Sequence, residues 1–387
     1  MRLLELLLVI KPMCDHKPKI LFVPYKLHFR YFLFALAEKN NVTVLLPPEK
    51  NLPEKTQLNG VRIHYKQFAI DKIKNFIGRE LRTQKYIENF VNVLDLQNPN
   101  VLITCEFYHW YTLQGLFYKK RRPDMQFFVV SETKNWPKNF VARQVKKLMF
   151  FYFKANKRHV DAMLVYTEQA REFLSKQIPG MKTILVPAPI DTKLFDKGCE
   201  HEFYKENTLK ILFNARYSPY KRHKDMFLAV SQLLGSGYKV AVTCISRDDK
   251  RLNDILKIAN DVGVSEVIEF REAIALEDMP ALYRAHDVLI LPSYNEAIGM
   301  VVPEAMACGR ATITSDTVGA NIYVNNGVTG VIFKTGDIDS MVEAIKKCCD
   351  KKTLEDMGER ARNHIIDNFS AEKVVLDLEN LIKVADN

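Results

Sequence analysis

The chain has 387 residues, more than one hydrophobic core usually organises, and this length predicts two domains. Hydrophobic residues make up 47% and charged residues 26%, which excludes a disordered, collagen-like or coiled-coil protein. The seven cysteines include no C-x-x-C pair, and an odd number cannot all be joined in disulfides. We therefore expect a reducing, cytoplasmic location.

The net charge of +10 is unevenly distributed. Residues 1–200 contain 33 lysines and arginines against 18 acidic residues, a balance of +15. Residues 201–387 contain 23 against 28, a balance of −5. The basic half predicts either an anionic partner (a phospholipid surface, phosphate or nucleic acid) or a set of solvated side chains with no partner.

The amino half alternates strand-length apolar runs with longer segments. The run Leu3–Ile10 is about half the length of a membrane span, is interrupted by Glu5 and lacks a small-residue cleavage site, so it predicts neither a membrane helix nor a secretory signal. An amphipathic stretch covers Asp71–Leu96. Six strands are predicted, at Lys19–Val23, Val42–Leu46, Val101–Thr104, Phe127–Val130, Ala162–Val165 and Thr183–Val186.

The segment Phe140–Arg158 interleaves bulky apolar residues with lysine and arginine. This pattern is typical of a core helix with a solvated basic face. It is also typical of a basic amphipathic helix that lies in a membrane interface, and with the basic amino half it leads us to expect peripheral attachment.

The carboxyl half has a clearer alternation of strands and helices. Gly235, Gly263 and Gly309 follow helix-length segments, as carboxyl caps do. Six strands are predicted, at Ile211–Asn214, Val240–Ile245, Val267–Phe270, Val288–Leu291, Ala311–Thr314 and Gly330–Phe333. The fold class is therefore α/β, with two doubly wound, Rossmann-like domains that we expect to face each other across a cleft.

The boundary between the domains is predicted where polar residues cluster, at Asp196–Asn207. The expected domains are residues 1–200 and residues 201–369. Residues 370–387 are expected to form a carboxyl-terminal helix that packs back towards the first domain.

The segment Asp287–Gly309 combines a buried strand, a loop and a helix start. Pro303 suits the first turn of a helix because its missing N–H is not needed there, so Glu296 is expected in the loop and Glu304 in the first helical turn. Unpaired amides and the helix dipole favour a bound anion at a helix start. Both glutamates can also be explained without a bound anion, Glu304 as a favourable first-turn acid and Glu296 as a solvated loop residue. The four amides just before the helix belong to Ala297, Ile298, Gly299 and Met300.

A second charged segment follows the strand at Ile211–Asn214. Arg216 and Lys221 fall in the loop after this strand. The planar guanidinium and the compact ammonium suit a diphosphate, whereas the pair taken alone is more typical of a solvated basic loop. Both segments open onto the same edge of one predicted sheet, and this coincidence favours a binding site.

These motifs resemble those of glycosyltransferase family 4, the group 1 glycosyl transferases, which are retaining enzymes of the GT-B architecture. The resemblance covers about residues 183–370 and rests on Arg216 with Lys221 and on the E-x7-E pair Glu296 and Glu304. Three stretches add to it: Glu304–Gly309, Pro189–Phe195 and Asn325–Phe333. The amino half resembles the family only in its strand rhythm.

The resemblance implies a metal-independent, retaining hexosyltransferase that moves a sugar from a UDP- or GDP-linked donor to a lipid-linked, polysaccharide or other glycan acceptor. Arg216 and Lys221 would hold the diphosphate and Glu304 the ribose hydroxyls. Glu296 and the amides of residues 297–300 would contact the donor sugar and phosphate. The departing phosphate would take the acceptor proton, so a paired nucleophile and acid would not be needed. No cofactor is expected.

The amino half departs from the family in two places. The loop Pro24–Arg30 lacks the glycines that many relatives carry, so close approach of this backbone to phosphate is not expected. Ser131 and Glu132 stand where relatives often carry a histidine. The acceptor-side residue is therefore left open between Glu132, Glu106 and His109.

No metal site is predicted. Asp337–Asp339 resembles the metal-binding D-x-D of other sugar transferases, but its place at a helix start favours capping. The nine histidines show no ligand spacing. Cys348 and Cys349 are interpreted as packing residues within an amphipathic helix.

Two other functions stay open at this point: a GT-B glycosyltransferase that acts on DNA, and a non-catalytic GT-B partner subunit. The expected partners are a nucleotide-sugar donor, a glycan or lipid-linked acceptor and an anionic membrane surface, with nucleic acid not favoured. The expected location is cytoplasmic and peripheral on the inner face of a membrane.

Overall fold

A computed structural model describes residues 18–23, 36–37, 40–46, 59–62, 65–67, 85–87, 89–137, 139–198, 203–246, 250–294 and 296–384. The chain forms two compact units, residues 1–186 with 375–387 and residues 187–374. The apolar run Leu3–Ile10 and the loop Pro24–Arg30 lie outside the described residues.

The division between the units lies before Pro187, earlier in the chain than the expected boundary at residue 200. The residues that follow Pro187 are held by the second unit. Ile190 forms a β-bridge with Ser370, and the Tyr323 hydroxyl donates to the carbonyl of Ala188 at 2.9 Å. Aromatic and backbone contacts that are distant in sequence thus bind this segment to the second unit.

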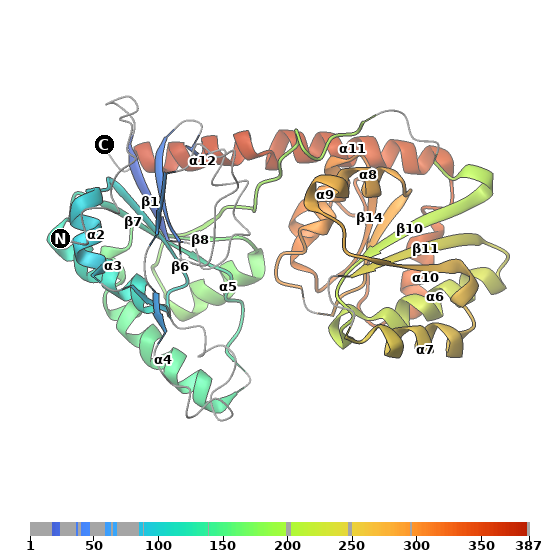
Figure 1. Ribbon diagram of the computed structural model, residues 1–387, viewed down its shortest axis with the longest axis horizontal. Helices are drawn as coiled ribbons and strands as arrows, with labels where there is room; N and C mark the ends of the chain where they lie inside the picture. The colour runs from blue at the N-terminus through green and yellow to red at the C-terminus, as the bar shows by residue number, and fades with distance from the viewer. Residues whose placement is uncertain are drawn as a thin grey trace. The chain divides into compact units, whose positions relative to one another are not determined.

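The first unit contains a seven-stranded parallel sheet in the order β3-β2-β1-β6-β7-β8-β9 (Figure 1). All six predicted strands are present. The strands of this sheet are β1 (Lys19–Val23), β2 (Asn41–Leu46), β3 (Asn59–Arg62), β6 (Val101–Cys105), β7 (Gln126–Ser131), β8 (Ala162–Val165) and β9 (Thr183–Leu185). A separate antiparallel pair joins β4 (Tyr65–Gln67) to β5 (Lys85–Ile87).

Four helices of this unit share one core with the sheet. They are α2 (Phe90–Gln97), α3 (Trp110–Arg121), α4 (Phe140–Ala155) and α5 (Glu168–Gln177). The starts of α4 and α5 follow from local chemistry, because the side chains of Asn139 and Thr167 accept hydrogen bonds from amides in the first turn.

The second unit repeats the topology, with a six-stranded parallel sheet in the order β12-β11-β10-β13-β14-β15. All six strands predicted for this half are present. They are β10 (Thr208–Asn214), β11 (Lys239–Ser246), β12 (Ile268–Glu272), β13 (Val288–Leu291), β14 (Ala311–Ser315) and β15 (Val331–Phe333).

Helices lie on both faces of the second sheet, as Figure 1 shows for α8 and α9 on one side and α6, α7 and α10 on the other. The helices of the second unit are α6 (His223–Gly235), α7 (Leu252–Val262), α8 (Met279–Arg284), α9 (Val301–Ala307), α10 (Ile338–Lys346) and α11 (Lys351–Phe369). The last helix, α12 (Ala371–Val384), begins in the second unit and belongs to the first unit from Val375 on. The prediction of two doubly wound α/β sheets is confirmed.

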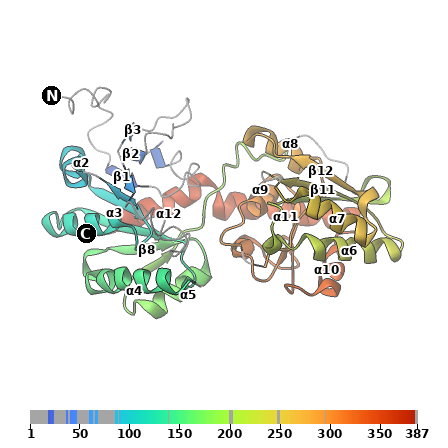
Figure 2. The same cartoon turned by 60° about the horizontal axis from the view of Figure 1, so that its bottom comes forward.

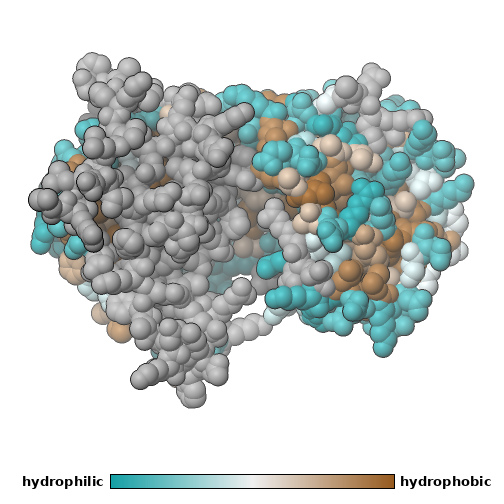
Figure 3. Space-filling view, viewed as in Figure 1, coloured by the Kyte–Doolittle hydropathy of each residue, from teal (hydrophilic) through white to brown (hydrophobic). Residues whose placement is uncertain are grey.

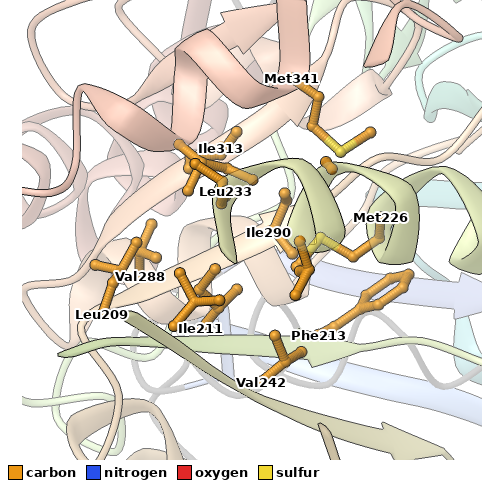
Figure 4. Packing of buried hydrophobic residues seen from close by; sticks show 14 of the residues in the cluster. Leu209, Ile211, Phe213, Met226, Leu233, Val242, Val288, Ile290, Ile313 and Met341 are labelled. Carbon is orange, nitrogen blue, oxygen red and sulfur yellow. The ribbon is translucent and has the colours of Figure 1, made fainter. Parts of the chain in front are cut away.

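The core of the second unit explains its continuous apolar strands. Figure 4 shows branched side chains of β10 and β13, among them Ile211 and Ile290, packed against Met226 and Leu233 of α6. Strands covered on both faces have no solvent side, so their sequences do not alternate with polar residues.

Helix ends match most of the sequence predictions. Asp337 caps α10 by accepting a hydrogen bond from the amide of Ser340, and Gly263 caps α7 with φ +77°. Gly235 is instead the last residue of α6, and Gly237 takes the left-handed conformation after it. Cys348 and Cys349 were predicted inside a helix, which is wrong: α10 ends at Lys346, and both cysteines pack on the core from the following turn.

The described helices include none with the length and apolar character to cross a membrane. On the face of the second unit seen in Figure 3, apolar side chains appear between hydrophilic ones. Apolar side chains scattered over a surface in this way are normal for a folded protein.

Candidate functional site

The second sheet changes direction between β10 and β13. The chain moves outward from β10 to β11 and β12, then returns to β13 on the other side of β10. In doubly wound sheets, ligands bind at the carboxyl ends of the strands that flank such a point. The loop after β10 contains Arg216 and Lys221, and the loop after β13 contains Glu296. The sequence therefore places these predicted site residues on the two sides of the switch point.

The two loops are joined through Lys221 and Glu296. Lys221 ends a short 3₁₀ turn over Pro219–Lys221, and its Nζ forms an ion pair and hydrogen bond with Oε2 of Glu296. The amide of Tyr294 also donates to the carbonyl of Tyr220 at 2.8 Å. The predicted meeting of these two loops is thus present in the structure.

The positive charge of this edge is concentrated. Burial lowers the pKa of Lys221 to about 8, and the charge of Arg216 adds to this effect. The side chain of Arg216 is exposed. Lys221 is partly desolvated and lies in the field of Arg216, so an anion bound at this edge would offset both effects.

The turn that follows Glu296 has a fixed shape. Gly299 has φ +72°, and a Cβ built there would lie 3.1 Å from side-chain carbons of Ala320 and Leu291, so the turn requires glycine. The carbonyl of Glu296 accepts a hydrogen bond from the amide of Gly319 at 3.0 Å. Among the described residues, no backbone carbonyl accepts from the amides of Ala297, Ile298, Gly299 and Met300.

Glu304 lies in the first turn of α9, as predicted, and is nearly buried. Its Oε2 accepts a hydrogen bond from the hydroxyl of Tyr283 at 2.7 Å. Burial, reinforced by the Glu304 charge, raises the pKa of Tyr283 well above its usual value, so this hydroxyl keeps its proton. The side chain of Asn214, at the end of β10, hydrogen-bonds the same tyrosine. Tyr283 was missed from the sequence because α8 carries no motif.

In the first unit, Glu106 occupies the equivalent switch point, directly after β6. It has φ +64° and is buried. Its carboxylate accepts hydrogen bonds from the hydroxyls of Ser131 and Thr133, both at 2.9 Å, and from the amide of Glu132 at 2.8 Å. Burial raises the pKa of Glu106, and the Glu132 amide and the charge of Lys146 partly oppose that rise. Glu106 thus anchors the loop that follows β7.

The three acceptor-side candidates meet at this edge but differ in access. The ring of His109 is fully buried, with its centroid 5.0 Å from those of Tyr108 and Tyr111. Glu132 is half-buried, and its backbone is held by Glu106. Of the three, Glu132 is therefore the one whose side chain reaches solvent.

We expect Glu106→Ala to lower the free energy of unfolding by about 1–3 kcal/mol, because three donors near Ser131 lose their acceptor in a buried site. Chemical denaturation measures this change. Glu132→Ala is the matched control, since it keeps the backbone amide that Glu106 binds, and it is expected to change stability by less than about 0.5 kcal/mol. Equal losses in the two variants would contradict the anchoring role.

No group of three histidine, cysteine or acidic side chains is placed to hold a metal ion within the described part of the chain.

Comparison with known proteins supports the sequence resemblance. Residues 200–364 match the family model of the glycosyl transferases group 1. The D-inositol 3-phosphate glycosyltransferase of Corynebacterium kroppenstedtii is 29% identical over 157 residues, which are 40% of this chain and 33% of that protein. The chain thus spans about a third of the length of this relative.

Solved structures match nearly the whole chain. A glycosyltransferase from Rickettsia africae has a TM-score of 0.75 at 15% identity, covering 96% of this chain and 100% of that one. The Anabaena protein Alr3699/HepE in complex with UDP has a TM-score of 0.72 at 14% identity, covering 95% and 100%. The chain therefore has the GT-B fold, and its residues 200–364 are similar to the glycosyl transferases group 1, in agreement with the resemblance drawn from Arg216, Lys221 and the paired glutamates.

Proposed function

We propose that this protein is a retaining glycosyltransferase that transfers a hexose from a UDP- or GDP-linked donor to a lipid-linked, polysaccharide or other glycan acceptor. The observation that carries the proposal is the contact of Lys221 with Glu296 beside Arg216, at the switch point of the family-matched sheet. The fold shared with a UDP-bound protein supports a nucleotide-linked donor.

In this proposal each group has a task in donor binding. Lys221 exchanges its contact with Glu296 for a phosphate oxygen, and Arg216 adds its planar fork from the exposed side. Glu304, oriented by Tyr283, accepts hydrogen bonds from the ribose hydroxyls. Once Lys221 binds phosphate, Glu296 is left to contact the donor sugar.

The rate enhancement comes from charge. As the glycosidic bond breaks, its electron pair passes to the leaving phosphate, whose negative charge grows between Lys221 and Arg216. Groups that already point there stabilise the transition state more than the ground state. The acceptor oxygen forms its bond to the anomeric carbon on the face that the phosphate leaves, and its proton passes to the leaving phosphate, so the anomeric configuration is retained. No metal or cofactor enters this scheme.

We place the acceptor near Glu132, at the carboxyl edge of the first sheet, and the enzyme in the cytoplasm at the inner face of a membrane. The basic balance of residues 1–200 supports an anionic or membrane-borne acceptor.

Thermal-shift measurements with UDP, GDP and their sugar conjugates, each with and without a metal chelator, test the donor class. A matching donor at a hundred times its dissociation constant is expected to stabilise the protein by about 2.7 kcal/mol. The chelator is expected to leave the shift unchanged. No shift with either nucleotide series would contradict the proposal, and a shift that the chelator removes would contradict metal independence.

The basic half also fits a GT-B enzyme that glycosylates DNA. Competition between duplex DNA and the acceptor, steeply dependent on salt, would favour that function. Turnover of any sugar nucleotide would exclude a non-catalytic partner subunit, a role that the retained residues Arg216, Lys221, Glu296 and Glu304 argue against.

A further inference from the structure

The helix α4 has two apolar faces. Its inner face buries Met149, Phe150 and Phe153 in the core of the first unit. Its outer face exposes Phe140 by 70% and both Leu148 and Phe151 by 71%. Positions 140, 148 and 151 fall on one side of a helix with 3.6 residues per turn. A helix that only covers a sheet needs one apolar stripe, so the outer one calls for another explanation.

The exposed apolar surface continues onto α3. The ring of Phe117 is 54% exposed and lies 5.8 Å from that of Tyr152 on α4. The Nζ of Lys120 lies 5.5 Å from the Phe117 centroid. Six of the thirteen exposed large hydrophobic side chains of the described residues belong to α3 and α4. Exposed apolar side chains are thus concentrated on these two helices and are not spread evenly over the surface. Figures 1 and 2 show α4 at the periphery of the first unit.

The charge around this surface has a single sign. Residues 133–160 contain eight lysines and arginines and no acidic residue. Lys147 and Lys154 are exposed on the flank of the apolar stripe of α4. Acidic side chains on the adjoining segments are paired with bases: Asp161 with Lys119 at 3.2 Å, Asp124 with Arg122 at 2.7 Å and Glu168 with Arg171 at 2.7 Å. We name the set Phe117, Lys120, Phe140, Lys147, Leu148, Phe151 and Lys154 the α3–α4 face.

We propose that the α3–α4 face binds the surface of an anionic lipid bilayer. Phe140, Leu148 and Phe151 enter the boundary between headgroups and acyl chains, while Lys147 and Lys154 contact lipid phosphates. This inference does not depend on the transferase activity, because it rests on a surface remote in sequence from Lys221 and Glu296.

The chemistry of the face favours lipid over two other partners. A nucleic acid would engage the lysines but gain little from Leu148 and Phe151, which offer no hydrogen bond to a phosphate or base edge. A second copy of this chain would bring two basic surfaces together, and like charges across an interface oppose binding. An anionic bilayer is complementary to both the charge and the apolar stripe.

Cosedimentation of the full chain with lipid vesicles tests the proposal. We expect strong binding to mixed phosphatidylcholine–phosphatidylglycerol vesicles at low salt, and weak binding to phosphatidylcholine alone. Leu148→Gln and Phe151→Gln are each expected to weaken binding about tenfold. Lys147→Gln and Lys154→Gln are each expected to weaken it about fivefold, and only for the anionic vesicles. All four side chains are exposed, so the variants keep the fold.

Matched controls come from the same unit. Leu96→Gln removes a side chain on α2 that is 59% exposed, and Lys182→Gln removes an exposed lysine outside the face. Neither is expected to change vesicle binding. The proposal is overturned if the controls lose as much binding as the face variants, or if wild type sediments equally with neutral and anionic vesicles.

Two further measurements distinguish the other partners. Size-exclusion chromatography tests for a dimer: a wild-type dimer that the Leu148→Gln variant loses would make the face an interface between copies. A binding assay with duplex DNA and no vesicles tests for a nucleic acid: binding that depends on Lys147 and Lys154 would make the face a nucleic-acid surface. Either result would overturn the lipid assignment. Donor-induced thermal stabilisation is expected to stay unchanged in the face variants, so failure of the lipid proposal and failure of the proposed function have separate readouts.

Discussion

Lys221→Ala is expected to lower the turnover number for sugar transfer by about a hundred- to a thousandfold. The leaving phosphate gains negative charge in the transition state, and removal of one preorganised donor at such a position costs about 2.7–4 kcal/mol. Glu296→Ala is expected to lower turnover by a similar factor through loss of the sugar contact. Steady-state kinetics with the donor identified by thermal shift measures both effects.

Glu304→Ala is expected to act differently from Lys221→Ala. The contact that we propose between Glu304 and the ribose would be the same in the ground state and the transition state. Its loss is therefore expected mainly as a tenfold to hundredfold rise in the donor KM, on the order of one charge-assisted hydrogen bond. Tyr283→Phe, which removes the hydroxyl that orients Glu304, should raise the same KM about fivefold.

Lys224→Ala and Glu277→Ala are matched controls, because both side chains are exposed and carry the same charges as the residues tested. They are expected to leave the kinetics unchanged. Undiminished turnover in Lys221→Ala and Glu296→Ala together would remove this pair from the mechanism.

The sequence predicts the second unit better than the first, because the strands and the helix start of the second unit are determined by short local sequence patterns. Strands such as Val288–Leu291 are buried on both faces and read as continuous apolar runs. Pro303 places Glu304 in the first turn of α9 whatever surrounds it. By contrast, β3 to β5 were missed because they are three or four residues long and carry no apolar run.

The parts of the site that sequence reasoning missed depend on contacts between distant residues. Tyr283 and Glu304 are 21 positions apart and meet only because α8 packs beside α9. Glu106 appeared as a candidate for acceptor activation, but the hydroxyls of Ser131 and Thr133, 25 and 27 positions away, turn it into an anchor for a neighbouring loop. Such pairings follow from strand order, which no local pattern specifies.

The affinity for the donor is expected to fall as the pH rises above 8. The pKa of Lys221 is lowered to about 8, first by burial and then by Arg216. Only the protonated ammonium attracts phosphate. The fraction of Lys221 that is protonated is close to one at pH 6, and well above the pKa it falls about tenfold for each pH unit. At pH 8 half of the lysine is charged and at pH 10 about one hundredth, so the affinity of the wild type should fall about fiftyfold over this range.

Lys221→Arg isolates this effect, because a guanidinium stays charged throughout the range. The other titratable neighbours do not interfere: burial lowers the pKa of His223 to about 4 and raises that of Tyr217 to about 12. Calorimetric titration of both proteins with the same nucleotide from pH 6 to pH 10 cancels ionisation of the base, since the ratio of the two affinities contains only the lysine. We expect this ratio to be flat below pH 7 and to fall above pH 8. A flat ratio up to pH 10 would mean that the ammonium of Lys221 does not hold the diphosphate, and donor binding would then rest on Arg216 and the amides of the 297–300 turn.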